Sequence, residues 1–195
     1  AIGGTALDRT MEVQPLTDRV RADRIAADLA DAGRVVGFQV GASHSYNMWP
    51  IDCFIQLAER ILADDLEVTI VVTGIDRERP LGERLVQACG KRVLNLCGSY
   101  GIADLPYLIR RFSLLVTGDT GPMHLAIAMK VPTISLFSAA DPRFTGPYQD
   151  AGLHRVIRKD GSFIKSLPKK QRDDSAMRLI PVDEVFAAYE ESMRR

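Results

Sequence analysis

The sequence predicts an α/β fold, a Rossmann-like domain of three layers around a parallel sheet. Apolar segments rich in β-branched residues recur along the chain, and segments with helical spacing lie between them. The strand segments are apolar throughout rather than alternating, as is typical of a parallel sheet covered on both faces. Ligands of such sheets bind beyond the carboxyl ends of the strands, so the turns that follow the strands are the first candidates for a site.

Six strands are expected, over residues 34–40, 67–74, 92–98, 114–118, 131–137 and 154–159. The helices between them are expected over residues 50–62, 81–89, 103–112 and 122–130. The first of these helices has the clearest pattern, because its apolar residues recur at i, i+3, i+4 and i+7 and form one face: Phe54, Leu57, Ala58 and Ile61.

The two ends of the chain have a different character. Residues 17–32 alternate in charge and predict a surface helix, closed by Gly33 as a C-cap. Residues 159–180 are polar and weakly patterned, which predicts a loop. The tail, residues 181–195, predicts a last helix with one apolar face, formed by Val182, Val185, Phe186 and Tyr189.

Composition excludes several classes of protein. The 195 residues are 46% apolar and 26% charged, the balance of a globular protein, and 25 basic residues match 25 acidic ones. No global charge attracts a nucleic acid, so no nucleic-acid partner is expected. Without an apolar run of roughly 20 residues or a leader pattern, we expect a cytoplasmic protein. Three cysteines without CxxC spacing indicate reduced packing residues rather than disulfides or a zinc site.

The turn "TGDTGPMH" predicts an anion site. Gly118 and Gly121 allow close approach of the backbone, Thr120 can cap a helix, and Pro122 suits the first helical position. Backbone N–H groups at such a helix start favour an anion, and His124 adds a donor one turn later. Phosphate or diphosphate is the ligand expected at this helix start. The alternative is that the turn only caps a buried helix and His124 is a core histidine.

The same region lacks the best-known phosphate motifs. Neither GxxxxGK[ST] nor GxGxxG is present, and no DxDG-type motif accompanies Asp119.

The turn "QVGASHSYNMWP" also connects a strand to a helix, with Gly41 for a tight turn and hydroxyls on Ser43 and Ser45. Taken alone, this second stretch is better interpreted as an ordinary polar loop between a strand and a helix.

Together, "VGFQVGASHSYNMWPIDCFIQLAERIL" and "GDTGPMHLAIAMKVPTISLFSAADPRFTGPY" resemble the C-terminal half of the bacterial heptosyltransferases, glycosyltransferase family nine. The D-T-G-P-x-H-L-A-x-A-x-x-x-P-T core and its spacing to G-A-S…W-P carry the resemblance. It implies the second half of a two-domain GT-B type glycosyltransferase. Residues 1–32 would then be the interdomain connection and surface helix, and residues 33–180 the nucleotide-sugar-binding domain. Residues 181–195 would pack toward the N-terminal half, leaving apolar surface exposed in this chain.

The resemblance also implies an activity. Such enzymes transfer heptose from ADP-heptose to the inner core of lipopolysaccharide with inversion at the anomeric carbon, and they use no bound metal or other cofactor. The N-terminal half binds the lipopolysaccharide acceptor and supplies the catalytic base, so no catalytic residue is expected in this chain. The chain alone is expected to bind its donor without transferring the sugar. Peripheral membrane association of the full-length enzyme is compatible with this assignment.

The family motif assigns donor-binding residues. Ser43 and Asn47 belong to the loop near the diphosphate, and Glu78 stands where a ribose contact is expected. In the turn "TGDTGPMH", the family motif places four residues along the donor sugar and diphosphate: Asp119, Thr120, Gly121 and His124. The two residues between them, Pro122 and Met123, are further candidates.

Two positions depart from the family pattern. The family usually has Pro where Val40 stands and Lys where Asn47 stands, and that lysine supplies positive charge to the diphosphate. Three interpretations remain open: His44 compensates in part, the donor is another nucleotide sugar, or the chain is a degenerate binding or interaction module. Met123 and Trp49 are candidates for stacking on a base, but core packing is the favoured interpretation, and a solvent-facing Arg143 is favoured over a phosphate contact.

Overall fold

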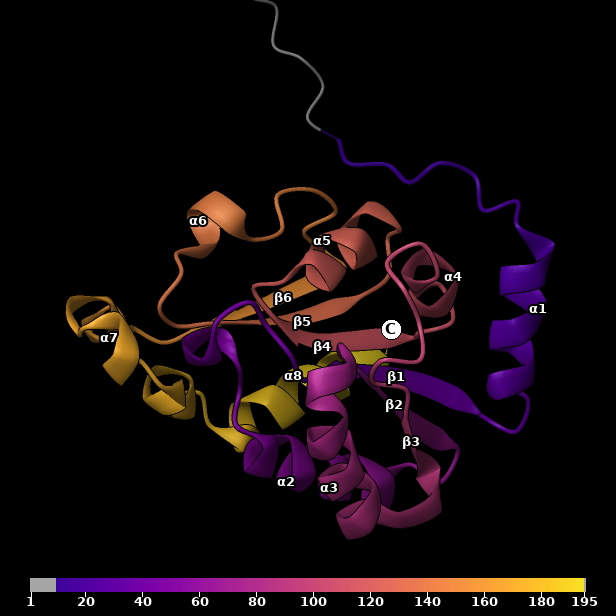
Figure 1. Cartoon of the computed structure of the whole chain (residues 1–195), viewed down its shortest axis with the longest axis horizontal. Coiled ribbons are helices and arrows are strands. Elements are labelled where there is room, and N and C mark those ends of the chain that lie inside the picture. Colours follow the sequence, from indigo (N-terminus) through magenta and orange to yellow (C-terminus); the bar gives the residue numbers. More distant parts are fainter. Residues whose placement is uncertain (1–9, 195) are drawn as a thin grey trace, which may run out of the picture.

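The computed structural model describes residues 10–194. Six strands form one parallel sheet in the order β3-β2-β1-β4-β5-β6 (Figure 1). The chain therefore builds the sheet outward from β1, returns to its middle at β4 and builds outward again, so the topological switch lies between β1 and β4. The strands are β1 (Arg34–Gln39), β2 (Val68–Thr73), β3 (Val93–Asn95), β4 (Leu114–Gly118), β5 (Thr133–Phe137) and β6 (His154–Arg158).

Eight α-helices accompany the sheet within the described residues. They are α1 (Arg19–Asp28), α2 (Ile51–Asp64), α3 (Arg79–Cys89), α4 (Leu105–Ile109), α5 (Gly121–Ala128), α6 (Pro142–Thr145), α7 (Phe163–Ser166) and α8 (Val182–Met193). Short 3-10 turns lie at Ser45–Asn47 (η1), Asp76–Glu78 (η2), Gly90–Arg92 (η3), Lys169–Gln171 (η4) and Asp174–Leu179 (η5). The predicted α/β class with a parallel sheet is confirmed.

One face of the sheet is covered by α2, α3 and α8. Val36 and Phe38 of β1 join this face, and the predicted apolar stripe of α2 is buried against it. Trp49 lies edge to face with Phe54, 5.0 Å between ring centres, and its indole N–H donates to the Ile180 carbonyl at 3.2 Å. Core packing of Trp49, the favoured interpretation, is confirmed.

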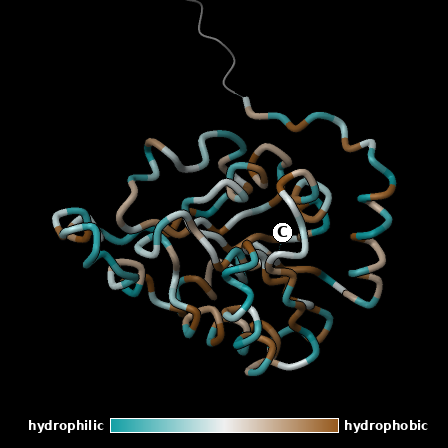
Figure 2. Tube along the Cα trace, in the orientation of Figure 1, coloured by the Kyte–Doolittle hydropathy of each residue, from teal (hydrophilic) through white to brown (hydrophobic). Residues whose placement is uncertain are grey.

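The opposite face is covered by α1, α4 and α5. Val35, the residue of β1 that alternates with Val36, packs in this second cluster with Ile25 of α1 and Leu108 of α4. Figure 2 shows hydrophobic residues concentrated in the middle of the molecule and hydrophilic ones along its outer segments. Apolar residues on both faces explain why the strand segments are apolar without alternation.

Some predicted boundaries were wrong. The third strand ends at Asn95 rather than at residue 98, because the Asn95 side chain accepts from the Cys97 N–H at 3.2 Å and Gly98 has a φ of 73°. Helix α1 ends at Asp28, so Gly33 is not its C-cap. Gly33 instead allows a close approach, since a Cβ there would stand 2.2 Å from the Glu67 carbonyl oxygen.

The segment over residues 159–180 is more ordered than the predicted loop. It contains α7, η4 and η5, and four of its apolar side chains are buried: Ile164, Ala176, Met177 and Ile180. These residues are too widely and irregularly spaced to give a periodic signal, so the sequence pattern missed the short helical turns that they anchor.

Helix α8 buries the apolar face that was expected to stand exposed. Val185 and Tyr189 are buried in the core beneath α8, which packs against α2, β5 and β6. The Arg60 guanidinium covers Phe186, 4.1 Å from the ring centre. The expectation of exposed apolar surface on this helix is therefore wrong, because the domain's own sheet and α2 cover it. Its packing toward an N-terminal half stays a prediction.

Candidate functional site

A cavity of about 370 Å³ lies at the carboxyl ends of β1, β2 and β4, beside the topological switch. We call it the strand-end cavity. It is lined by Gln39, Gly41, Ala42, Ser43, Gly74, Ile75, Arg77, Glu78, Tyr100, Gly101, Ile102, Leu105, Thr120, Gly121 and Pro122. Five sequence-predicted residues are thus brought together here from three separate loops: Ser43, Glu78, Thr120, Gly121 and Pro122.

Glu78 is fixed in the wall of the strand-end cavity. Its carboxylate accepts from the Ile75 N–H at 2.7 Å and from the Arg77 Nε–H at 3.2 Å, and the residue is 5% exposed. Gly41 and Gly74, which follow β1 and β2, leave the space that the carboxylate fills. The parallel sheet thereby presents one negative group, held by two hydrogen bonds, at the ends of two adjacent strands.

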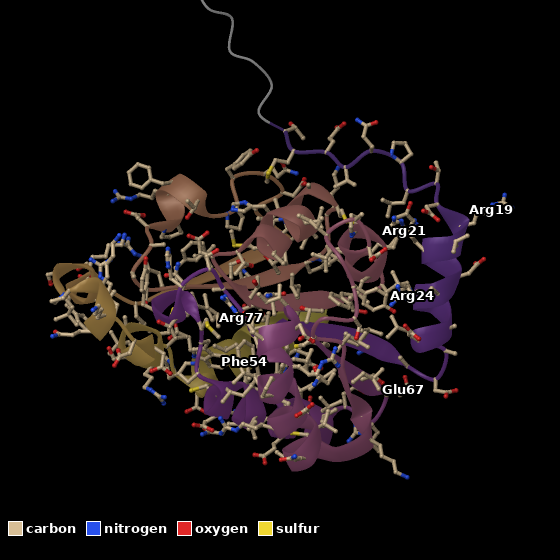
Figure 3. The ribbon with its side chains drawn as sticks, viewed as in Figure 1. Arg19, Arg21, Arg24, Phe54, Glu67 and Arg77 are labelled. Carbon is tan, nitrogen blue, oxygen red and sulfur yellow. The ribbon has the colours of Figure 1, made fainter. Side chains whose placement is uncertain are left out.

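Arg77 is the one positively charged side chain among the described residues that line the strand-end cavity. Its Nε pairs with Glu78, and its Nη2 donates to the Ala42 carbonyl at 3.4 Å. The side chain is 65% exposed, so further guanidinium N–H groups remain accessible. Figure 3 places Arg77 near the middle of the molecule, in the η2 turn directly before α3, whereas Arg19, Arg21 and Arg24 lie on α1 at the edge.

Apolar side chains form another part of the strand-end cavity. Ile102 is 87% exposed and Ile75 is 56% exposed, and both line the cavity with Leu105 and Pro122. The Tyr100 hydroxyl donates to Asp28, and burial together with that bond raises the pKa of the phenol above its ordinary value. Tyr100 is therefore a neutral, anchored wall of the cavity near pH 7.

Helix α5 begins at the strand-end cavity without a side-chain cap from the residues described. Thr120 occupies the N-cap position, but its hydroxyl lies 2.9 Å from the Thr117 hydroxyl and makes no bond to an α5 amide. Thr120 thus stands at the N-cap position, as predicted, but its hydroxyl interacts with Thr117 instead of capping an α5 amide. A Cβ on Gly121 would meet no atom within 4 Å, so the helix start is open on the side of that residue.

The two predicted turns meet, although not all of their candidate residues line the strand-end cavity. The Asn47 carbonyl oxygen lies 2.6 Å from the place of a Cβ on Gly118, so only glycine admits this approach. Asn47 and His124 are half-buried outside the lining. Asp119 accepts from the Thr145 hydroxyl at 3.0 Å, which ties the turn to α6.

Two further candidates lie apart from the strand-end cavity. Met123 is fully buried with Ile127 and Phe137, so it packs in the core. Arg143 is exposed to solvent and pairs with Asp141 at 2.6 Å, which lowers the pKa of that carboxyl to about 2. In both positions the favoured interpretation, packing for Met123 and solvent exposure for Arg143, is confirmed.

Sequence reasoning missed Gln39, Arg77 and the loop that carries Tyr100 and Ile102. The Gln39 amide donates to the Gly41 carbonyl at 3.0 Å, so it shapes the turn after β1. The third strand also ends at this edge of the sheet. Because ligands bind beyond the carboxyl ends of parallel strands, the loop after that strand was a candidate from the strand prediction alone. Arg77 gave no signal beyond its place beside Glu78.

Within residues 10–194, no group of three or more His, Cys, Asp and Glu side chains is arranged to hold a metal ion, and the helices are too short or too polar to cross a membrane. The three cysteines are free. Burial, with a smaller contribution from Glu78, raises the pKa of the Cys97 thiol to about 12. That thiol is therefore protonated at neutral pH and is a poor nucleophile.

Several solved structures share this fold. The chain superposes on Escherichia coli ADP-heptose LPS heptosyltransferase II with a TM-score of 0.74 and 21% identity, covering 92% of this chain and 53% of that one. Against Escherichia coli heptosyltransferase WaaC with ADP, the TM-score is 0.66 at 22% identity, covering 92% of this chain and 51% of that one.

Sequence comparisons agree with these structures. Lipooligosaccharide heptosyltransferase 2 of Haemophilus influenzae is 31% identical over 137 residues, which are 67% of this chain and 38% of that protein. The chain thus spans well under two thirds of that relative's length. The model of glycosyltransferase family 9 (heptosyltransferase) matches residues 6–166. The chain therefore belongs to glycosyltransferase family 9, the heptosyltransferase family.

Proposed function

We propose that this chain is the donor-binding domain of an inverting glycosyltransferase that transfers heptose from ADP-heptose to the lipopolysaccharide inner core. The observation that carries the proposal is the convergence of Ser43, Glu78 and the Thr120–Pro122 turn on one cavity at the topological switch. Nucleotide ligands of doubly wound sheets bind at this place. Similar proteins are named for ADP-heptose or hold ADP, which agrees with the proposed donor.

The lining of the strand-end cavity suits the parts of a nucleoside diphosphate. The apolar side chains of Ile75, Ile102 and Leu105 offer a surface for a flat base. The Glu78 carboxylate, an acceptor fixed in the wall, suits the hydroxyls of a ribose. The Ser43 hydroxyl and the open start of α5 at Gly121 suit the diphosphate.

In the proposed reaction, an acceptor hydroxyl attacks the anomeric carbon from the face opposite the diphosphate. The bond from that carbon to the diphosphate oxygen breaks, ADP leaves with the electron pair, and the acceptor proton passes to a base in the N-terminal half. Negative charge grows on ADP as the bond breaks. The α5 dipole and the Arg77 guanidinium stabilise that charge, while Asp119 and His124 face the transferred sugar.

One position favours a second candidate function. Asn47 stands where the family usually has lysine, and an amide supplies no positive charge to a diphosphate. On this alternative the domain is a nucleotide-sugar-binding or interaction module that has lost transfer activity, or it serves another nucleotide sugar. An interaction module, or a relative that serves another nucleotide sugar, differs from the first candidate in what the strand-end cavity binds, whereas a binding module that has only lost transfer differs in turnover.

Calorimetric titration of the chain with ADP, UDP and adenosine tests the donor assignment. The proposal predicts that ADP binds, that adenosine binds more weakly because it lacks the diphosphate, and that UDP gives no heat. Tighter binding of UDP than of ADP would instead indicate a relative that uses another nucleotide sugar. No binding of any of the three would leave the interaction module as the surviving candidate.

A further inference from the structure

A second cavity, of about 360 Å³, is built from the next residues of the loop that follows β1. We call it the basic cavity, and it is lined by His44, Ser45, Tyr46, Lys169 and Arg172. Two segments far apart in the sequence form it, η1 on one side and the chain around η4 on the other. The adjacent residue Ser43 lines the strand-end cavity, so the two cavities share one loop.

The walls of the basic cavity are fixed by specific contacts. The Ser45 hydroxyl donates to the Arg172 carbonyl at 3.2 Å. The Tyr46 ring packs against a small apolar cluster that includes Ile164 and Ala176. The His44 ring stacks on Tyr46 with 4.9 Å between ring centres and 12° between planes, and the Arg172 guanidinium lies 5.8 Å from the centre of the same tyrosine ring.

No carboxylate of the described residues lines the basic cavity. Arg172 is held by carbonyl oxygens, with its Nε donating to Leu167 at 3.0 Å and its Nη2 to Lys165 at 2.7 Å. These neutral acceptors anchor the guanidinium without cancelling its charge. Lys169 forms no ion pair with any residue described, and no acidic side chain lines the cavity.

The nearest acidic residues in the sequence, Asp173 and Asp174, line an adjoining pocket that shares Ser45 and Arg172 with the basic cavity, but they do not line the basic cavity itself. Asp173 accepts from the Ser175 N–H at 3.0 Å, and Asp174 pairs with Arg178 at 2.9 Å. A hollow lined by two cations and an imidazole, with no carboxylate in its own lining, attracts an anion. An anchored guanidinium also loses little conformational freedom when it binds a phosphate or carboxylate.

We propose that the basic cavity binds a phosphate or carboxylate group on the saccharide acceptor. The acceptor must approach the donor sugar, and a ligand held at His44 and Lys169 lies directly beside the loop that reaches the strand-end cavity. The cavity's affinity for an anionic sugar stands on the contacts above, whereas naming that sugar the acceptor rests on the proposed function. The rival occupant is the donor's own diphosphate, since the two cavities are neighbours.

A nuclear magnetic resonance titration of the ¹⁵N-labelled chain tests this proposal with three probes: glucose 6-phosphate, glucuronate and uncharged glucose. The titration is run with and without saturating ADP. We expect both charged sugars to shift the amide signals of residues 44–46 and 169–172, and glucose to shift none of them. ADP should leave the affinity for the charged sugars unchanged.

Adjacent lysines provide a matched pair of variants. Lys169 lines the basic cavity and Lys170 does not, although both are exposed. Lys169→Gln should weaken binding of glucose 6-phosphate about threefold, as expected for one exposed charge contact, while Lys170→Gln should leave it unchanged.

Three results would overturn the proposal. Equal weakening by the two variants would mean that general surface charge attracts the sugar. Displacement of glucose 6-phosphate by ADP would assign the cavity to the donor diphosphate. Absence of shifts with both charged sugars would show that the basic cavity does not bind anionic sugars. If ADP itself does not bind, the donor assignment fails, and the titration without ADP still decides whether the basic cavity is an anion site.

Discussion

The carboxylate of Glu78 occupies the space that a side chain on Gly41 would need. A Cβ at position 41 would stand 2.1 Å from Oε2 of Glu78, and a Cβ on Gly74 would stand 2.8 Å from the same oxygen. Real Cβ contacts are never this short, so a side chain at either position forces a displacement. The ends of β1 and β2 therefore meet on one carboxylate, and the strand-end cavity keeps its shape because both residues are glycine.

Gly41→Ala is expected to push Glu78 out of the cavity wall. Overpacking of this kind costs about 1–3 kcal/mol of stability, which chemical denaturation measures. The affinity for ADP should fall as well, because the Glu78 carboxylate that accepts hydrogen bonds from the ribose hydroxyls moves. Gly152→Ala is the matched control, since a Cβ there meets no atom within 4 Å. Unchanged stability and ADP affinity in Gly41→Ala would refute this account of the wall.

Arg77→Gln should weaken ADP binding about fivefold and leave adenosine binding unchanged. The reason is that Arg77 is the one cation lining the strand-end cavity within the described chain, and its 65% exposure keeps the effect small through screening. Arg79→Gln is the control, because Arg79 pairs with Asp76 and does not line the cavity. Equal losses for adenosine and ADP would show that Arg77 only supports the fold of the wall.

Asn47→Lys should tighten ADP binding if position 47 borders the diphosphate, as the family motif implies. A charge-assisted hydrogen bond contributes about 1.5–3 kcal/mol, which corresponds to at least a tenfold gain in affinity. Calorimetry on the variant and the wild type measures the gain. An unchanged affinity would place position 47 away from the diphosphate, in keeping with its absence from the cavity lining.

His154 predicts a pH dependence of stability. Burial lowers its pKa below the ordinary value of 6.5, and its Nδ1 lies 3.1 Å from the Thr133 hydroxyl while Nε2 has no partner among the described residues. Below pH 6.5 the unfolded chain binds a proton that the folded state resists. The free energy of unfolding should therefore fall as the pH drops from 6.5 toward the lowered pKa of the folded state, and stay level above 6.5.

His154→Asn isolates this contribution, because asparagine keeps a polar atom near Thr133 and does not titrate. The variant is expected to lose less stability between pH 7 and pH 5 than the wild type, as measured by denaturant unfolding at each pH. The same loss in both proteins would mean that carboxylates, and not His154, control stability in this range.

Strand positions were predictable because burial on both faces requires apolar residues at every position. The stripe from Phe54 to Ile61 was equally clear, since one helix face meets one sheet face. The ends of elements were harder. A side-chain bond from Asn95 and the positive φ of Gly98 ended β3 early, and such local bonds leave no periodic trace.

The site was predictable where backbone geometry decides it. Gly118 and the Thr120–Pro122 turn had to lie at a strand end, and the parallel sheet brought Ser43 and Glu78 to the same edge. The role of Arg77 and the existence of the basic cavity depend on side chains that meet across long stretches of sequence. Ser45 and Arg172 are 127 positions apart, and only the folded chain brings them together.

A calorimetric titration of this chain with ADP-heptose beside ADP decides whether it carries a donor-sugar site. We expect both ligands to bind and ADP-heptose to bind more tightly, because Asp119 and His124 add contacts to the sugar. His124→Ala should reduce the difference between the two ligands. No heat from either ligand, or equal affinity for both in the wild type, would contradict the claim that these residues form a donor-sugar site.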